Sequence, residues 1–420
     1  MFKKAFAVFF SFVIALLSLS AAAFAGSEEQ GTDYPFVFVH GLMGWGEGQR
    51  VDEFMPYWGT TSGSVVKYLE RQGYDVYTAS VGGASSAWDR ACELYAQLTG
   101  TTVDYGKAHS EKYGHARFGR TYDEPLCPTF GQTDENGDII KINLVGHSMG
   151  GVTIRMFASI LEYGVPEEAD ACSDASDFFK GGKGEYIHSI TTLSAPHNGS
   201  LAADRENDAF INMMLHLFYY LWGVLDNTPL RPLWDIQLEH FGFTDYPADG
   251  FDGEFSIELI NEMMNSEDSA YYDLTLKGAA QANEKIKMVD DVYYFSYSSE
   301  CVFESPVTGK LYPEPTMNPL FLFTTSPKIC DYDGSGQGGV PADESWRLND
   351  GIVSTQGSAM YPEGEAHTDF NPNCVEKGVW NVMPVVESMD HTDYMGVFYD
   401  PIKIRKFYKD ICELVCSLPA

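Results

Sequence analysis

Short runs of β-branched and aromatic residues alternate with helical patterns along this chain. The strand-like runs lie at 34–39, 75–81, 139–145, 187–194 and 292–298. One helical pattern covers 65–71, and another follows Gly150, where apolar residues recur at the spacing of one buried helix face: Ile154, Phe157, Ala158 and Leu161. Strands that alternate with helices predict an α/β fold with a mostly parallel sheet flanked by helices.

The last helical pattern begins at Pro401, and Asp400 is well suited to be its N-cap. Its predicted inner face carries Ile404, Phe407, Tyr408 and Ile411. The glycine-rich stretch at 331–340 indicates a surface loop, and no repeat or clear linker divides the chain. We therefore expect one domain over 26–420, with insertions at about 82–135 and 200–245.

The first residues have the pattern of a secretory signal peptide. Lys3 and Lys4 precede an apolar run at 5–19, and Ala23-Phe24-Ala25 supplies small residues for cleavage. We expect the leader to comprise residues 1–25 and the mature protein to be secreted. No later stretch reaches the roughly 18 consecutive apolar residues that a membrane span needs.

The charge balance excludes one class of partner. The chain has 60 acidic and 27 basic side chains and a formal charge of −33, which becomes −35 without the two leader lysines. Nucleic-acid binding depends on basic patches, so we expect no nucleic-acid partner.

Eight cysteines are present, and in an exported protein an even count permits disulfides without fixing their pairing. Buried free thiols are the alternative. No C-x-x-C pair occurs, so a cysteine-rich zinc module is not indicated.

The pentapeptide Gly-His-Ser-Met-Gly at 146–150 carries the candidate nucleophile, Ser148. Small residues around a serine also occur in ordinary turns. Here an apolar strand enters the pentapeptide and a periodic helix leaves it, which is the setting of a nucleophile elbow. Glycine on both sides lets the chain turn sharply enough to expose the serine above the sheet edge.

A serine hydroxyl needs a base, and the base needs an acid to orient it. In this fold the acid and then the histidine follow the serine along the chain. Only His367 and His391 lie far enough beyond Ser148, and His391 is favoured because it directly precedes the last helix. Asp350 is the candidate acid, although Asn349-Asp350-Gly351 is equally a turn signal.

Acyl transfer also needs main-chain donors for the oxyanion. Met149, directly after the nucleophile, is one candidate, and Leu42 in the segment His40-Gly41-Leu42-Met43-Gly44 is the other. His40-Gly41 taken alone also fits a turn at a strand end.

Five longer segments carry a family resemblance: HGLMGWG (40–46), WDRACELYAQL (88–98), TVDYGKAHSEKYGHARFGRTY (102–122), NDGIV (349–353) and KGVWN (377–381). At these residues the chain resembles the thermoalkalophilic lipases of Gram-positive bacteria, α/β-hydrolases with structural zinc and calcium. The resemblance extends from about 35 to 414 and implies a triad of Ser148, Asp350 and His391, with oxyanion donors at Leu42 and Met149.

The chain departs from that family at three places. Family members commonly have alanine in place of Gly146 and glutamine in place of Met149. Neither change affects the chemistry, because glycine is usual in the wider fold and the Met149 donor is main chain. An extra stretch at 123–138, which contains Cys127, is expected to be a surface loop.

The resemblance also implies a structural zinc site. Asp89, His109 and His115 match three of its ligands, and Glu239 takes the place of the fourth, an aspartate in the family. Without the resemblance, two histidines six residues apart equally fit hydrogen-bonded surface residues. Four protein ligands would leave no open position for water, which indicates a structural role.

A calcium site is the second metal that the resemblance implies. Asp393 matches an acidic ligand two residues after the catalytic histidine, Asp400 and Pro401 match an Asp-Pro pair, and a carbonyl near Ser305 completes the set. The Asp-Pro pair lies two residues further along than in the family, and capping the last helix is a sufficient alternative role for Asp400.

Bulky apolar residues dominate 209–225. A buried helix would explain them, but the resemblance implies a helical lid that covers Ser148 in water and opens at a lipid surface. The sequence therefore predicts a secreted lipase that hydrolyses triacylglycerols or other long-chain esters. A carboxylesterase or phospholipase with the same triad is the alternative, and a non-catalytic lipid-binding homologue is a third interpretation.

Overall fold

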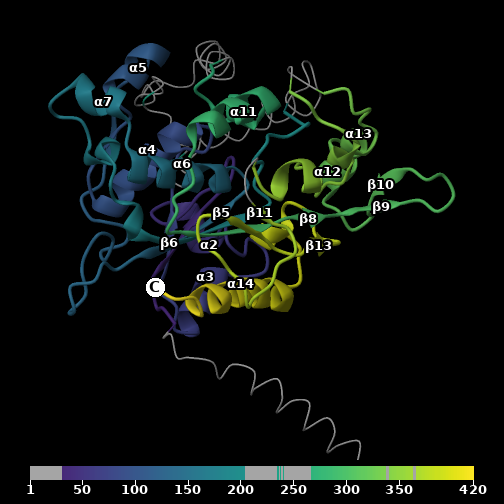
Figure 1. Cartoon of the computed structure of the whole chain (residues 1–420). Coiled ribbons are helices and arrows are strands. Elements are labelled where there is room, and N and C mark those ends of the chain that lie inside the picture. The colour runs from purple at the N-terminus through teal and green to yellow at the C-terminus, as the bar shows by residue number, and fades with distance from the viewer. Residues whose placement is uncertain are drawn as a thin grey trace, which may run out of the picture.

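A seven-stranded parallel sheet forms the centre of the molecule (Figure 1). The computed structural model describes residues 31–203, 234, 235, 237, 240, 266–336, 340–362 and 366–420. The strands of the sheet are β1 (Phe36–Val39), β2 (Val76–Ala79), β5 (Ile142–His147), β6 (Ile187–Leu193), β7 (Tyr293–Tyr297), β11 (Ala366–His367) and β12 (Trp380–Val382). Their order is β11-β12-β7-β6-β5-β1-β2, and every pairing is parallel. This arrangement confirms the predicted α/β class.

Helices cover both faces of the sheet, with α4 and α6 on one face and α3 and α14 on the other (Figure 1). The helices are α2 (Arg50–Phe54), α3 (Val65–Arg71), α4 (Ala87–Thr99), α5 (Lys107–Tyr113), α6 (Met149–Tyr163), α7 (Pro166–Ala171), α10 (Ala270–Leu274), α11 (Leu276–Lys285), α12 (Pro319–Leu322), α13 (Ser326–Cys330) and α14 (Pro401–Cys416). Short helical turns are η1 (Asp177–Lys180), η2 (Gly184–Tyr186), η5 (Glu344–Arg347), η6 (Thr355–Ala359) and η7 (Asp393–Met395).

Strand β1 shows how the sheet separates two cores. Phe36 and Phe38 pack with residues of α3 and α14, whereas Val37 and Val39 pack with residues of α4 and α6. Successive side chains of a strand point to opposite faces, so a strand covered on both sides favours apolar residues at successive positions. This explains the continuous apolar run of β1, whereas β6 (Ile187–Leu193) also buries His188, Ser189, Thr191 and Thr192.

The principal elements lie where the sequence predicts them. Helix α3 has the predicted bounds, and β1, β2, β6 and β7 each begin or end within two residues of the predicted runs. Asp400 caps α14 by accepting hydrogen bonds from the backbone N–H groups of Ile402 and Lys403 at 2.8 and 3.3 Å. The capping prediction is therefore confirmed.

Three pairs of short strands lie outside the main sheet. The pairs β3 (Thr102–Asp104) with β4 (Phe118–Thr121) and β9 (Val302–Glu304) with β10 (Leu311–Pro313) are antiparallel, whereas β8 (Ser299–Glu300) and β13 (Val386–Glu387) are parallel. Each strand has two to four residues, which is too short for a periodic pattern in the sequence.

Several sequence predictions concern residues outside the described ranges. The signal peptide, the lid at 209–225 and Glu239 are among them. Within the described residues, no helix combines the length and apolarity that a membrane crossing requires. All eight cysteines are described and all are unpaired. The stretch at 123–138 is largely exposed, but Cys127 is buried in the core beside α4, so this part of the stretch is not a surface loop.

Gly150 gives a test of how closely α6 approaches the sheet. A Cβ atom at this position would lie 2.1 Å from the carbonyl oxygen of Val39, which belongs to the backbone of β1. We expect Gly150→Ala to lower the free energy of unfolding by about 1–3 kcal/mol, because α6 or β1 must move. Urea denaturation measures this change. Gly83→Ala is the control, since its Cβ would meet no atom closer than 3.4 Å; an equal loss in both variants would contradict the argument.

Candidate active site and metal centre

Ser148 lies at the sharp turn between β5 and α6. Its backbone has φ 55° and ψ −129°, a conformation that non-glycine residues rarely adopt. The backbone N–H of Ser148 donates to the carbonyl of Leu193 in β6 at 2.9 Å, which anchors the turn to the sheet. A strained serine between a buried strand and a helix is the geometry of a nucleophile elbow.

His391 and Asp350 form the hydrogen-bonded pair that the sequence predicted. His391 Nδ1 lies 2.7 Å from Asp350 Oδ2, and the backbone N–H of His391 donates to the Asp350 carbonyl at 2.9 Å. Asp350 Oδ1 accepts from the backbone N–H groups of Ile352 and Val353 at 3.1 and 2.8 Å. The carboxylate is therefore fixed in plane, and it orients the imidazole.

Ser194 is a further partner of Asp350 that the sequence analysis missed. It follows β6, has a positive φ of 44°, and its hydroxyl donates to Asp350 Oδ2. His367, the alternative base, is exposed on β11 and lies 3.4 Å from Glu376, away from Asp350. The structure therefore joins His391, and not His367, to the predicted acid.

Ser148 and His391 line one pocket together with Leu42. The rest of the lining is mainly apolar and includes Leu274, Leu320, Phe321, Ile352 and Val353. Met149 is the first residue of α6, where backbone N–H groups have no partner within the helix. Nucleophile, base and both predicted oxyanion residues thus lie at the carboxyl ends of the strands.

The segment after β1 that carries Leu42, here called the oxyanion loop (40–44), folds around a buried charge. Arg90 on α4 donates to the carbonyls of His40 and Gly82, the latter at 2.9 Å, and to Thr153 Oγ1 at 2.8 Å. Burial, together with the nearby Arg90 charge, lowers the pKa of His40 to about 3, so this histidine is neutral. The guanidinium therefore ties the oxyanion loop to α4 and α6.

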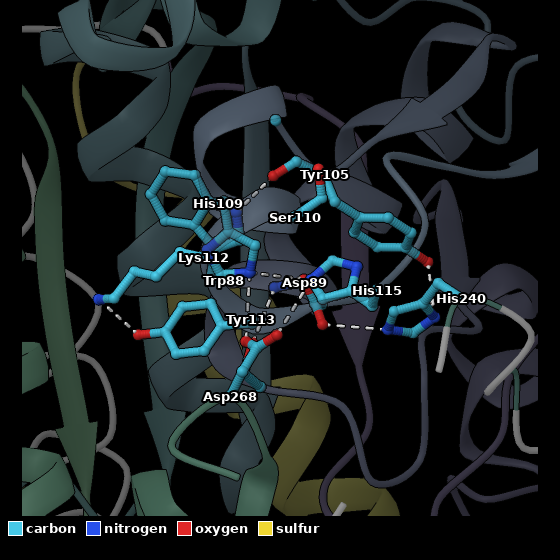
Figure 2. Close-up of polar contacts among 12 residues, drawn as sticks. Trp88, Asp89, Tyr105, His109, Ser110, Lys112, Tyr113, His115, His240 and Asp268 are labelled. Atoms are coloured by element: carbon cyan, nitrogen blue, oxygen red, sulfur yellow. Dashed lines mark hydrogen bonds and ion pairs between the residues drawn. The ribbon is translucent and has the colours of Figure 1, made fainter. Parts of the chain in front are cut away.

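A second cluster of polar side chains surrounds Asp89, the residue of α4 that precedes Arg90 (Figure 2). Asp89, His109, His115 and Asp268 each direct one donor atom to a common point, and these atoms lie within 4.8 Å of one another. His109 Nε2 is 3.3 Å from Asp89 Oδ1 and 3.2 Å from Asp268 Oδ1, and His115 Nε2 is 3.1 Å from Asp268 Oδ2. Among the described residues this is the one group of three or more such side chains that could hold a metal ion.

The donor set and its spacing fit zinc. Tetrahedral ligands about 2.0–2.1 Å from Zn²⁺ are separated from one another by about 3.3–3.4 Å, close to the distances found here. Asp89 Oδ1, His109 Nε2 and Asp268 Oδ2 are buried and have no partner with hydrogen-bond geometry. Buried polar atoms without such partners are costly, and a shared cation would satisfy them.

The ionisation of the cluster is coupled to its contacts. Burial alone would lower the pKa of His109, but the close Asp268 and Asp89 carboxylates raise it to about 9. Burial alone would raise the pKa of Asp268, yet the contacts with His109 and His115 bring it well below its usual value. Without a metal, His109 is therefore protonated near neutral pH, and a bound cation would displace that proton.

Asp268 is the residue that the sequence analysis missed. It supplies the fourth donor of the described cluster, whereas the predicted ligand Glu239 lies outside the described residues. The start of α10 docks on the start of α4, because the backbone N–H of Ala270 donates to the Ala84 carbonyl at 3.0 Å. This docking brings Asp268 against Asp89, and no sequence spacing signals it.

A chain of hydrogen bonds connects the candidate metal site with Gly82, which Arg90 in turn joins to the oxyanion loop. His240 Nε2 lies 3.0 Å from Asp89 Oδ2, and His240 Nδ1 lies 3.2 Å from the Tyr105 hydroxyl (Figure 2). Tyr105 donates to Glu93 at 2.9 Å, and Glu93 accepts from the backbone N–H of Gly82 at 2.5 Å. Gly82 is the residue whose carbonyl binds Arg90, so both sites share α4 as their support.

The residues predicted for calcium have other contacts. Asp400 caps α14, Asp393 accepts from the backbone N–H of Asp390 at 2.8 Å, and the Ser305 carbonyl accepts from Gly309 at 2.8 Å within the β9–β10 turn. Pro401 is the first residue of α14. The calcium site stays a prediction.

Comparisons with known proteins agree with this geometry. A family model described as a lipase-like, C-terminal domain matches residues 32–416. Lipase 2 of Staphylococcus aureus is 35% identical over 393 residues, which cover 90% of this chain and 53% of that protein. The lipase of Staphylococcus hyicus is 33% identical over 395 residues, covering 91% and 58%. The chain thus spans about half the length of the curated relatives it matches.

Solved structures give the same result at the level of the fold. EstA from Clostridium botulinum superposes with a TM-score of 0.81 and 33% identity, covering 94% of this chain and 90% of that one. Lipase 1 from Pelosinus fermentans has a TM-score of 0.78 and 34% identity, covering 93% and 100%. These similarities confirm the resemblance to lipases of Gram-positive bacteria and the α/β-hydrolase fold, and the chain belongs to the family of lipase-like, C-terminal domains.

Proposed function

We propose that this chain is a secreted lipase that hydrolyses long-chain carboxylic esters through an acyl-enzyme on Ser148. One observation carries the proposal: His391, which is hydrogen-bonded to Asp350, lines the same apolar pocket as the strained Ser148. Non-catalytic lipid binding would not require a nucleophile elbow, an oriented imidazole and adjacent main-chain donors together.

The mechanism follows from the positions of these groups. His391 takes the proton of the Ser148 hydroxyl as the serine oxygen attacks the ester carbonyl. Asp350 keeps the other ring nitrogen protonated and stabilises the imidazolium. The backbone N–H groups of Leu42 and Met149 bind the oxyanion, and His391 then protonates the leaving alcohol. Water enters, and the same base repeats the step to release the acid.

The apolar pocket favours a fatty acyl group over a small polar one. Leu320 and Phe321 of α12 and Leu274 of α10 lie along it, and burying a methylene group in such surroundings contributes about 0.8 kcal/mol. A carboxylesterase or phospholipase would use the same machinery, and acyl-length preference separates the first of these from a lipase.

For the metal centre we propose a structural zinc ion bound by Asp89, His109, His115 and Asp268. With four protein ligands, the ion would have no open position for water and would take no part in the chemistry. Bound there, zinc would supply a positive charge that stabilises two buried carboxylates and connects α4, α5 and the segment before α10.

Replacing the proposed nucleophile tests the reaction. We expect Ser148→Ala to reduce hydrolysis of a p-nitrophenyl ester by about 10⁴-fold or more, because no other side chain supplies the attacking oxygen. The melting temperature should stay close to that of the wild type. Retained hydrolysis in the folded variant would disprove the proposed nucleophile.

Hydrolysis rates across acyl lengths test the substrate class. With triacylglycerols and p-nitrophenyl esters of short to long chains, both dissolved and emulsified, we expect the rate to rise with chain length and to increase above the solubility limit. The reason is the apolar pocket beside Ser148. A preference for short dissolved esters would indicate a carboxylesterase.

A matched pair of variants tests the fourth metal ligand. We expect Asp268→Asn to lower zinc affinity by about 10-fold or more, whereas Glu239→Gln should leave it unchanged. Elemental analysis and competition with a chromophoric chelator measure the metal content and the affinity. The opposite result would assign the ligand to Glu239, and the absence of zinc from the purified wild type would contradict the site.

A further inference from the structure

One hydrogen-bond chain joins the oxyanion loop to the loop of the catalytic base through two buried side chains. The backbone N–H of Gly41 donates to Tyr57 Oη at 2.9 Å, and Tyr57 Oη lies 2.7 Å from His147 Nδ1. His147 Nε2 lies 3.1 Å from the carbonyl oxygen of His391. Neither Tyr57 nor His147 has a role in the mechanism described above.

The two ends of this chain, together with a neutral His147, fix the direction of every bond. A backbone carbonyl can only accept, so His147 Nε2 carries the ring proton and donates to His391. A neutral imidazole then has no proton on Nδ1, so Nδ1 accepts from the Tyr57 hydroxyl. A backbone N–H can only donate, so Tyr57 Oη also accepts from Gly41.

The surroundings keep both groups in the required state. Burial raises the pKa of Tyr57, so the phenol keeps its proton. Burial and the neighbouring His391 bring the pKa of His147 well below its usual value, so the imidazole is neutral. The chain therefore keeps one proton arrangement near neutral pH.

Packing leaves these side chains little freedom. The ring of Tyr57 meets Trp45 and Trp58 edge to face, with centroids 5.6 and 5.1 Å apart. A Cβ atom on Gly41 would lie 2.8 Å from Ser148 Cβ and 3.0 Å from Tyr57 Oη, so glycine lets the loop approach both. His147 directly precedes Ser148. The two side chains therefore contact the oxyanion loop, the nucleophile turn and the base loop.

We propose that Tyr57 and His147 are positioning residues that set the spacing between the oxyanion donor at Leu42, the Ser148 hydroxyl and the His391 imidazole. The inference rests on the proposed function. Both ends of the hydrogen-bond chain are main-chain atoms, so the chain holds the oxyanion loop and the base loop at a fixed spacing. A shift of about 1 Å between reacting groups can cost about 10²-fold in rate. Residues that only fill the core would affect stability and leave the chemical step unchanged.

Tyr57→Phe removes the hydroxyl at the centre of the chain and keeps the ring. Tyr294→Phe is the matched control, because its buried hydroxyl also accepts a backbone N–H, that of Val289 at 2.8 Å, but lies apart from the pocket. With a dissolved p-nitrophenyl ester we expect Tyr57→Phe to lower kcat by about 10–100-fold with KM within about threefold. Tyr294→Phe should change kcat by less than about twofold, whatever both variants do to the melting temperature.

His147→Asn tests the other half of the chain. The shorter amide can still accept from Tyr57 but cannot reach the carbonyl of His391. We expect a loss of kcat similar to that of Tyr57→Phe, and a similar loss in the rate of covalent labelling by a p-nitrophenyl phosphonate. The kcat of the double variant should lie within about threefold of the kcat of the slower single variant. The reason is that the effects of two residues that act as one unit are not additive.

The outcomes separate the inference from the function on which it rests. If the wild type neither hydrolyses the ester nor reacts with the phosphonate, the proposed function is wrong and the inference fails with it. If the wild type is active and Tyr57→Phe behaves as Tyr294→Phe does, only the inference is wrong. Multiplicative losses in the double variant would also overturn it. Should Tyr57→Phe not fold, His147→Asn decides alone.

Discussion

The Arg90 guanidinium is a positive charge buried among main-chain carbonyls, and the loops of the active site are folded around it. Burial lowers its pKa to about 10, yet the group stays charged at neutral pH. Removing such a charge from water is costly unless hydrogen bonds replace the lost solvation. The carbonyls of His40 and Gly82 provide that replacement, which means that neither loop can move away without exposing an unsatisfied charge.

This constraint makes α4 the common support of two sites. Asp89 faces the metal centre, and the next residue, Arg90, faces the oxyanion loop, so the helix transmits its position to both. Glu93, one turn later, completes the connection through Tyr105 and Gly82. The zinc ion that we propose at one end of this arrangement would stabilise the helix that supports the loops around Ser148, without contact with the substrate.

Much of the fold could be predicted from the sequence, because buried parallel strands are rich in apolar and β-branched residues and surface helices have one apolar face. Ser148 could be predicted from its neighbours in the sequence, because a turn of this kind needs glycine on both sides. Asp268 could not be found this way, because it reaches Asp89 only through the docking of α10 on α4. The family resemblance implied Glu239 as the ligand, but similarity in sequence carries no information about that docking. Tyr57 and His147 could not be found from the sequence for a similar reason. Their sequence context does not distinguish them from other buried residues, and only the fold brings their polar atoms into one hydrogen-bond chain.

Ala203 lines the pocket that contains Ser148, and Ser266 lies two residues before Asp268 of the candidate metal site. The segment between Ala203 and Ser266 joins these two places. Both attachment points are hydrogen-bonded: the backbone N–H of Ala203 donates to the Ser200 carbonyl at 3.0 Å, and Ser266 Oγ accepts from the backbone N–H of Asp268 at 3.0 Å. Lengthening a chain segment whose ends are fixed is inexpensive, since each doubling of a flexible loop costs only about 0.6 kcal/mol. His240, whose Nε2 lies 3.0 Å from Asp89 Oδ2, fixes this segment at one intermediate point, so the length of the segment can change at this low cost on either side of His240 only where that contact is kept.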